Sequence, residues 1–171
     1  MPEYTYHDHV EAIIPASQAE VFAHLDDHTR LAAHMKKRSM MMLGGRMTYE
    51  FDAAQGRAVG SVIRMGGSFL GLSLFVEEVV TERTPPARKT WETRGRQRML
   101  IIDSYRMGFE TRPTGPHTGV RVFIDYRLPS PPLWHWAGRL FARFYARWCV
   151  SRMVKDLSRH FQADRPPQGV A

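Results

Sequence analysis

The feature that most constrains this fold is a stretch of thirty residues, Leu133–Gln162, that contains no proline and one glycine. Pro129, Pro131 and Pro132 stand directly before it and end any earlier strand, because proline fixes φ and has no N–H donor. Apolar residues recur within the stretch at three- and four-residue spacing, which predicts one long helix. Such a helix needs a broad apolar surface on which to bury its stripe.

Residues 46–128 supply that surface, because their hydrophobicity alternates with a period of two. Met47, Tyr49 and Phe51 alternate with polar residues, for example, and similar runs recur as far as Leu128. Short turns separate the runs, so consecutive strands should pair antiparallel. The expected strands are 47–51, 59–65, 69–81, 89–94, 100–111 and 120–128, with a bulge or sharp turn at Gly66-Gly67.

The N-terminal residues predict one strand and two short helices. Val10–Ile14 is rich in β-branched residues and ends at Pro15. Ser17 and Glu20 form a capping box that begins the first helix, and the second helix is expected at 29–35. The fold class is therefore α+β, with a curved antiparallel sheet of about seven strands around a long C-terminal helix. We expect a single domain over 1–162 and a flexible tail over 163–171.

Composition excludes several classes of function. The single cysteine, Cys149, excludes an intrachain disulfide and a Cys-rich zinc site. No stretch resembles a signal peptide or a membrane-spanning helix, so we expect a cytoplasmic protein. Five of the seven net positive charges lie after Pro131, but no nucleic-acid-binding motif accompanies them, so we expect no nucleic-acid partner. The histidines lack a third ligand at metal spacing and no nucleotide motif occurs, so we expect neither a metal nor a cofactor.

Two segments resemble a known superfamily. Residues 14–27, IPASQAEVFAHLDD, are similar to the opening of the polyketide cyclase/dehydrase-like branch of the START-like (SRPBCC) superfamily, and residues 76–91 resemble its central hairpin. The resemblance extends from about residue 7 to residue 161. It implies the helix-grip fold of Bet v 1-like proteins, with a deep cavity for an apolar or amphipathic ligand between helix and sheet. Members of the superfamily include both carriers and enzymes, so the resemblance leaves the activity open.

Large side chains on the faces expected to point inward are the candidates for lining that cavity. Each of them could instead pack in an ordinary core, where such residues are common. Tyrosine and tryptophan favour a ligand site slightly, because a buried O–H or N–H needs a partner. The candidates are Tyr49, Phe51, Ile63, Met65, Trp91, Tyr105, Met107, Phe109, Ile124 and Tyr126 on the sheet, and Ala137, Phe141, Phe144, Tyr145 and Trp148 on the helix.

Three residues are candidates for acid–base chemistry: Asp103, Tyr105 and Tyr126. Asp103 shares its expected strand face with Tyr105, and a carboxyl group that points into an apolar cavity has a raised pKa and can act as an acid or a base. The alternative is that Asp103 lies at the strand end, where it is solvated or paired with an arginine.

Three functions stay open on this evidence. The first is binding, for transport or sensing, of a hydrophobic small molecule such as a lipid, quinone or polyketide by a monomer or homodimer. The second is a cyclase or dehydratase-type enzyme that acts on such a ligand. The third is a peripheral membrane-surface protein, because Arg139, Arg143 and Arg147 form a basic stripe that could contact anionic lipid weakly. That stripe could equally be the solvated face of a core-packed helix.

Overall fold

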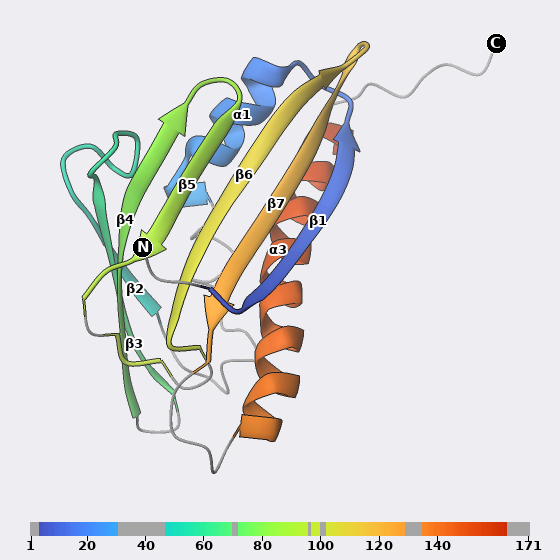
Figure 1. The fold of residues 1–171 in the computed structure, drawn as a ribbon. Coiled ribbons are helices and arrows are strands. Elements are labelled where there is room, and N and C mark those ends of the chain that lie inside the picture. Colours follow the sequence, from blue (N-terminus) through green and yellow to red (C-terminus); the bar gives the residue numbers. More distant parts are fainter. Residues whose placement is uncertain are drawn as a thin grey trace.

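A computed structural model describes residues 4–30, 47–69, 72–95, 97–99, 102–128 and 135–163. Its strands form one antiparallel sheet in the order β1-β7-β6-β5-β4-β3-β2, and α3 packs along one face of that sheet (Figure 1). The elements are β1 (Tyr6–Ile14), α1 (Gln18–Asp26), β2 (Met47–Phe51), β3 (Val62–Phe69), β4 (Leu72–Thr84), β5 (Arg88–Thr93), β6 (Ser104–Thr114), β7 (His117–Arg127) and α3 (His135–Ala163).

The predicted architecture of a seven-stranded antiparallel sheet and a long C-terminal helix is confirmed. The first short helix is α1, and its capping box forms as predicted: Ser17 accepts from the N–H of Glu20, whose carboxylate accepts from the N–H of Ser17. Most of the second predicted helix, 29–35, and the tail from residue 164 lie outside the described residues.

The predicted break at Gly66-Gly67 is wrong. β3 continues through both glycines to Phe69, in register with β2 on one side and β4 on the other. The Thr48 hydroxyl also donates to the carbonyl of Gly66 at 3.0 Å. Glycine permits a bulge but does not impose one, and pairing with two neighbouring strands keeps this ladder regular.

The core lies between the concave face of the sheet and the helices. Ala142, Ala146 and Val150 of α3 are fully buried and recur every four residues, so small side chains mark the line along which the helix meets the sheet. The helix aromatics lie to either side of that line, and Phe141 and Phe144 are 60% and 62% exposed. The prediction that these two residues point inward is therefore wrong, because the small residues set the rotation of the helix. The side chain of Ala137 lies outside the described residues.

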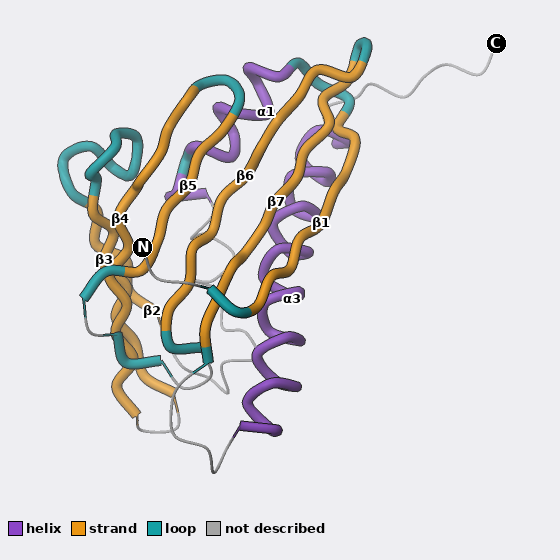
Figure 2. Tube along the Cα trace, viewed as in Figure 1, coloured by secondary structure: helices purple, strands orange, loops and turns teal. Residues whose placement is uncertain are grey.

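A buried ion pair between Lys89 and Asp26 fastens α1 to β5. Helix α1 lies at the end of the sheet near the C-terminal end of α3 (Figure 2), where His24 stacks on His160. Lys89 of β5 is fully buried and donates to the carboxylate of Asp26 at 2.7 Å and to its backbone carbonyl at 3.0 Å. The register of β4 shifts between Val80 and Glu82, which places Arg83 beside Lys89. Arg83 then donates to the same carboxylate at 2.8 Å. We call Asp26, His28, Arg83 and Lys89 the Lys89 cluster.

Burial controls the protonation states within the Lys89 cluster. It lowers the pKa of Lys89 to about 8. It would raise the pKa of Asp26, but hydrogen bonds from Arg83 and Lys89 outweigh it and hold that pKa below its usual range. Burial, followed by the charge of Lys89, lowers the pKa of His28 to about 3, so this imidazole is neutral. Its Nδ1 lies 3.0 Å from Lys89 Nζ and accepts a hydrogen bond, since an ammonium group has only donors.

Replacing Lys89 by methionine should lower the free energy of unfolding by about 3 kcal/mol, because it removes one partner of a buried ion pair. The adjacent Arg88→Met variant is the control, since Arg88 forms only half-exposed ion pairs with Glu82 and Glu110 and should lose about 1 kcal/mol or less. Urea unfolding of both variants measures the difference. Equal losses would contradict a special role for the buried pair.

Candidate functional site

One row of side chains crosses the concave face from β7 to β2. Tyr126 pairs with Tyr105, Glu78 pairs with both Thr93 and Ile63, and Ile63 pairs with Phe51. The hydroxyl of Thr93 accepts from the backbone N–H of Tyr105 at 3.1 Å and so joins the two halves of the row. Partners on one face of a sheet lie about 5 Å apart, so this register fixes which side chains can meet.

Near the middle of this row lies Glu78, a carboxyl group that our sequence analysis overlooked. Glu78 is 5% exposed; the Tyr105 hydroxyl donates to its Oε1, and the Trp91 side chain also hydrogen-bonds to it. Burial raises the pKa of Glu78 to about 7, although both hydrogen bonds and the charge of Lys89 act in the opposite direction. A carboxyl group with a pKa near neutrality can either accept a proton from a bound molecule or donate one.

Helix α3 and strand β2 add polar groups near this carboxyl. The hydroxyl of Tyr145 is hydrogen-bonded to the thiol of Cys149. The negative charge that Cys149 carries once it is ionised, together with burial, raises the pKa of Tyr145 well above its usual value. Burial, followed by the charge of Glu78, likewise raises the pKa of Tyr49 and Tyr105. Burial raises the pKa of Cys149 to about 12, so the thiol stays protonated and is a poor nucleophile.

These groups make up what we call the Glu78 cluster: Tyr49, Glu78, Trp91, Tyr105, Tyr145 and Cys149. Four of them, the three tyrosines and Cys149, keep partial solvent exposure. Nearby core residues such as Phe109 and Val122 have no solvent exposure. The polar part of the interior is therefore more accessible than the apolar core beside it.

The structure brings most of the predicted lining residues onto one face. Tyr49, Trp91, Tyr105 and Tyr145 belong to the Glu78 cluster. Trp148 is half-buried and stacks on Tyr145 with ring centroids 6.2 Å apart. Phe51 is partly buried, and the predicted residues that are buried on the sheet are Ile63, Met65, Met107, Phe109, Ile124 and Tyr126. Their contact with a ligand stays a prediction.

The structure separates the other two acid–base candidates from Glu78. Asp103 precedes β6, its side chain is 53% exposed, and it lies 3.4 Å from the guanidinium of Arg127. The prediction that Asp103 points into the interior is therefore wrong, because the strand begins only at Ser104 and the solvated alternative holds. Tyr126 is buried, but it stacks on Tyr6 at 5.5 Å, towards β1.

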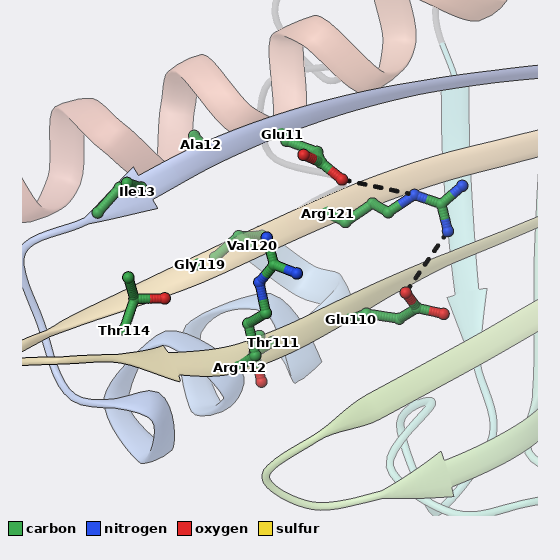
Figure 3. Close-up of a pocket in the computed structure, with 10 residues that line it drawn as sticks. All are labelled: Glu11, Ala12, Ile13, Glu110, Thr111, Arg112, Thr114, Gly119, Val120 and Arg121. Carbon is green, nitrogen blue, oxygen red and sulfur yellow. Dashed lines mark hydrogen bonds and ion pairs between the residues drawn. The ribbon is translucent and has the colours of Figure 1, made fainter.

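Two hollows lie on the surface. Of the residues predicted to line the interior site or to act in it, only Asp103 lines either hollow. A hollow of about 290 Å³ is lined by Asp103, Arg127 and Tyr4, among others. A larger one of about 480 Å³ lies on the outer face over β1, β6 and β7 (Figure 3). There Arg121 lies 3.9 Å from Glu11 and 3.5 Å from Glu110, and such exposed ion pairs contribute little energy.

Within the described part of the chain, no group of three or more histidine, cysteine or acidic side chains could hold a metal ion. None of the helices described there is both long and apolar enough to cross a membrane.

Comparison with known proteins identifies the fold through structures. No family model and no curated protein matches the chain. The crystal structure of TTHA0849 from Thermus thermophilus matches with a TM-score of 0.68 and 18% identity, over 94% of this chain and 100% of that one. A Thalictrum norcoclaurine synthase variant in complex with a transition-state analogue matches with a TM-score of 0.64 and 13% identity, over 95% of this chain and 98% of that one. Major latex-like protein 151 from Panax ginseng matches with a TM-score of 0.55 and 14% identity, over 91% of this chain and 97% of that one. At these identities the likeness shows the fold alone.

Replacing Glu78 by glutamine should remove a pH dependence of stability. The pKa of Glu78 is raised from 4.5 to about 7, so the folded state binds the extra proton between these values and wild-type stability falls as pH rises through that window. Relative to wild type, Glu78→Gln should therefore gain about 3 kcal/mol between pH 4 and pH 8. Urea unfolding across this range measures the gain.

The control is Glu77→Gln, because Glu77 lies on the opposite face and pairs with Arg64 at 2.9 Å. Its difference from wild type should change by less than about 1 kcal/mol over the same range. A Glu78→Gln difference that stays constant with pH would show that Glu78 is not a raised-pKa carboxyl.

Proposed function

Because the fold is the START/Bet v 1-like helix-grip fold, we propose that this protein binds a small, largely apolar molecule between the concave face and α3. The observation that carries the proposal is the Glu78 cluster, which sets a buried carboxyl and three tyrosine hydroxyls among apolar side chains. Burying a carboxyl group is costly. Ligand sites, by contrast, combine apolar walls with a few polar groups that orient the ligand.

Two further observations support the proposal. The tyrosines of the cluster and Cys149 keep partial exposure, which a fully packed core does not require. The norcoclaurine synthase structure, which holds a transition-state analogue, is an example of a small organic molecule bound by a protein of this fold. Affinity would come mainly from apolar burial, at roughly 25 cal/mol per Å². In the enzymatic alternative, a cyclase or dehydratase, the predicted candidate Tyr105 is kept, and Glu78 takes the place of Asp103 and Tyr126 as its acid–base partner.

Adding bulk at Cys149 should weaken binding. Cys149→Trp adds a large ring within the Glu78 cluster, whereas Lys155→Trp places the same ring on the exposed face of the same helix. We expect wild type and Lys155→Trp to bind the neutral probe 2-(2-naphthyl)ethanol equally, and Cys149→Trp to bind it at least tenfold more weakly. Isothermal titration calorimetry measures these affinities, and native mass spectrometry followed by organic extraction identifies any co-purified ligand. Equal binding by all three proteins would contradict a site at this position.

A second candidate function, a weak contact with an anionic membrane surface, rests on the outer face of α3. Phe141 and Phe144 expose more than half of their side chains there, and Arg143 and Arg147 are exposed beside them. Exposed aromatics next to basic residues suit a lipid interface, and each basic residue near anionic lipid adds about 1 kcal/mol. Arg147 also lies 3.3 Å from Asp8. The side chain of Arg139 lies outside the described residues.

Removing the two exposed phenylalanines tests this contact. Wild type should float with vesicles of phosphatidylcholine and phosphatidylserine but not with phosphatidylcholine alone. The double variant Phe141→Ser with Phe144→Ser should float at least fivefold less. Ile13→Ser is the control, because Ile13 is a 64% exposed apolar residue on β1. Flotation that does not depend on the phenylalanines would exclude this role for α3.

A further inference from the structure

We propose that the molecule bound at the Glu78 cluster carries a basic nitrogen, and that its ammonium group pairs with the Glu78 carboxylate among the surrounding aromatic rings. This inference rests on the proposed function and names the chemical class of its ligand. It follows from two features of the cluster: a buried carboxyl group with no counter-ion among the described residues, and aromatic side chains that approach that group from β5, β6 and α3.

Glu78 differs from other buried acidic groups in having no positive partner among the residues that the structure describes. Asp26 is paired with Lys89 and Arg83, and Asp125 is paired with Arg106 at 2.6 Å. In the described part of the chain no arginine, lysine or histidine forms an ion pair with Glu78, whose two hydrogen bonds come from the neutral donors Tyr105 and Trp91. A buried negative charge held only by neutral donors leaves room for a cation supplied by a ligand.

The nearest cations are already engaged elsewhere. Lys89 acts on Glu78 electrostatically, but its ammonium group is bound by the carboxylate and carbonyl of Asp26 and by His28. Arg83 shares Asp26, and its side chain is 29% exposed, so solvent screens its charge. The Lys89 cluster therefore keeps its positive charge close to Asp26.

Aromatic rings make the surroundings of Glu78 suitable for an ammonium group. Trp91 and Tyr105 contact the carboxyl directly, and Tyr145 lies close to it from α3. Ring faces attract cations, and tryptophan attracts them most strongly. The arginine–aromatic contacts in the described part of the chain use Phe22, Phe123 and Tyr4 instead. None of the arginines described by the structure therefore lies over the rings of Trp91, Tyr105 or Tyr145.

A protonated Glu78 could instead donate to a neutral ligand oxygen, and pH separates the two cases. An ammonium group pairs with the carboxylate, so its affinity rises as pH rises through about 7, whereas donation by the acid form gives the opposite trend. The other titratable groups that act on Glu78 or respond to its charge are Tyr49 from β2, Lys89 from β5, Tyr105 from β6 and Tyr145 from α3, and Cys149 is hydrogen-bonded to Tyr145. The pKa values of the tyrosines and the thiol are raised and that of Lys89 is about 8, so Glu78 is the group of this set whose ionisation changes most between about pH 5.5 and 7.5.

The experiment compares two probes of one shape, 2-(2-naphthyl)ethylamine and 2-(2-naphthyl)ethanol, by isothermal titration calorimetry. At pH 7.5 wild type should bind the amine about tenfold or more tightly than the alcohol, because a hydrogen bond between two charged groups is roughly twice as strong as one between neutral groups. That preference should shrink by about tenfold at pH 5.5, where Glu78 is largely protonated. Glu78→Gln should remove the preference at both pH values, and Glu77→Gln should keep it.

Two other outcomes would overturn either the inference alone or the proposed function as well. If wild type binds the alcohol at least as tightly as the amine, or if Glu78→Gln keeps the preference for the amine, the inference is overturned while the proposed function stands. If neither probe binds wild type, the proposed function is overturned and the inference with it. Circular dichroism at pH 5.5 checks that Glu78→Gln is folded, which its uncharged and nearly isosteric side chain favours.

Discussion

The buried contact between Lys89 and Asp26 joins the first helix to the middle strands of the sheet, and the arrangement of the interior depends on it. It holds His28 against Trp91, with ring centroids 4.9 Å apart, and Trp91 in turn hydrogen-bonds to Glu78. A continuous set of contacts therefore runs from the end of α1 to the carboxyl of the candidate site. Because a buried charge is tolerated only with its partners in place, this contact also limits how far α1 can move from the sheet.

The long helix has three different sides, and their separation explains the distribution of its aromatic residues. Ala142, Ala146 and Val150 touch the sheet, and their small size allows a close approach. Tyr145 lies on the side of the Glu78 cluster, while Phe141 and Phe144 lie in solvent. Residues that appear as one aromatic stripe in the sequence are thus divided between an interior site and an outer surface.

Much of the fold could be predicted, because a period of two and a long proline-free segment both leave strong patterns. Tyr49, Trp91 and Tyr105 were found because alternation identifies a strand face. Glu78 was missed because it follows Glu77, and two adjacent glutamates between apolar residues do not show which one points inward. Only the pairing of Glu78 with Thr93 and Ile63 shows that it is Glu78. Asp103 was wrongly predicted to point inward because the alternation of inward and outward side chains was extended to a residue that precedes the strand, which begins at Ser104. The face of α3 that meets the sheet was predicted wrongly because the large aromatic residues were assigned to it. Small residues occupy that face instead, since they allow the helix to approach the sheet closely.

The position of Cys149 has a practical consequence. It is the only thiol of the chain, and it lies within the Glu78 cluster, hydrogen-bonded to Tyr145. The S–H stretching vibration absorbs in an infrared window that other protein groups leave empty, and its frequency responds to hydrogen bonding and to the local electric field. The unmodified protein therefore carries a single vibrational reporter hydrogen-bonded to Tyr145, which in turn responds to the charge of Glu78, so a change in the protonation of that carboxyl can be followed without a label.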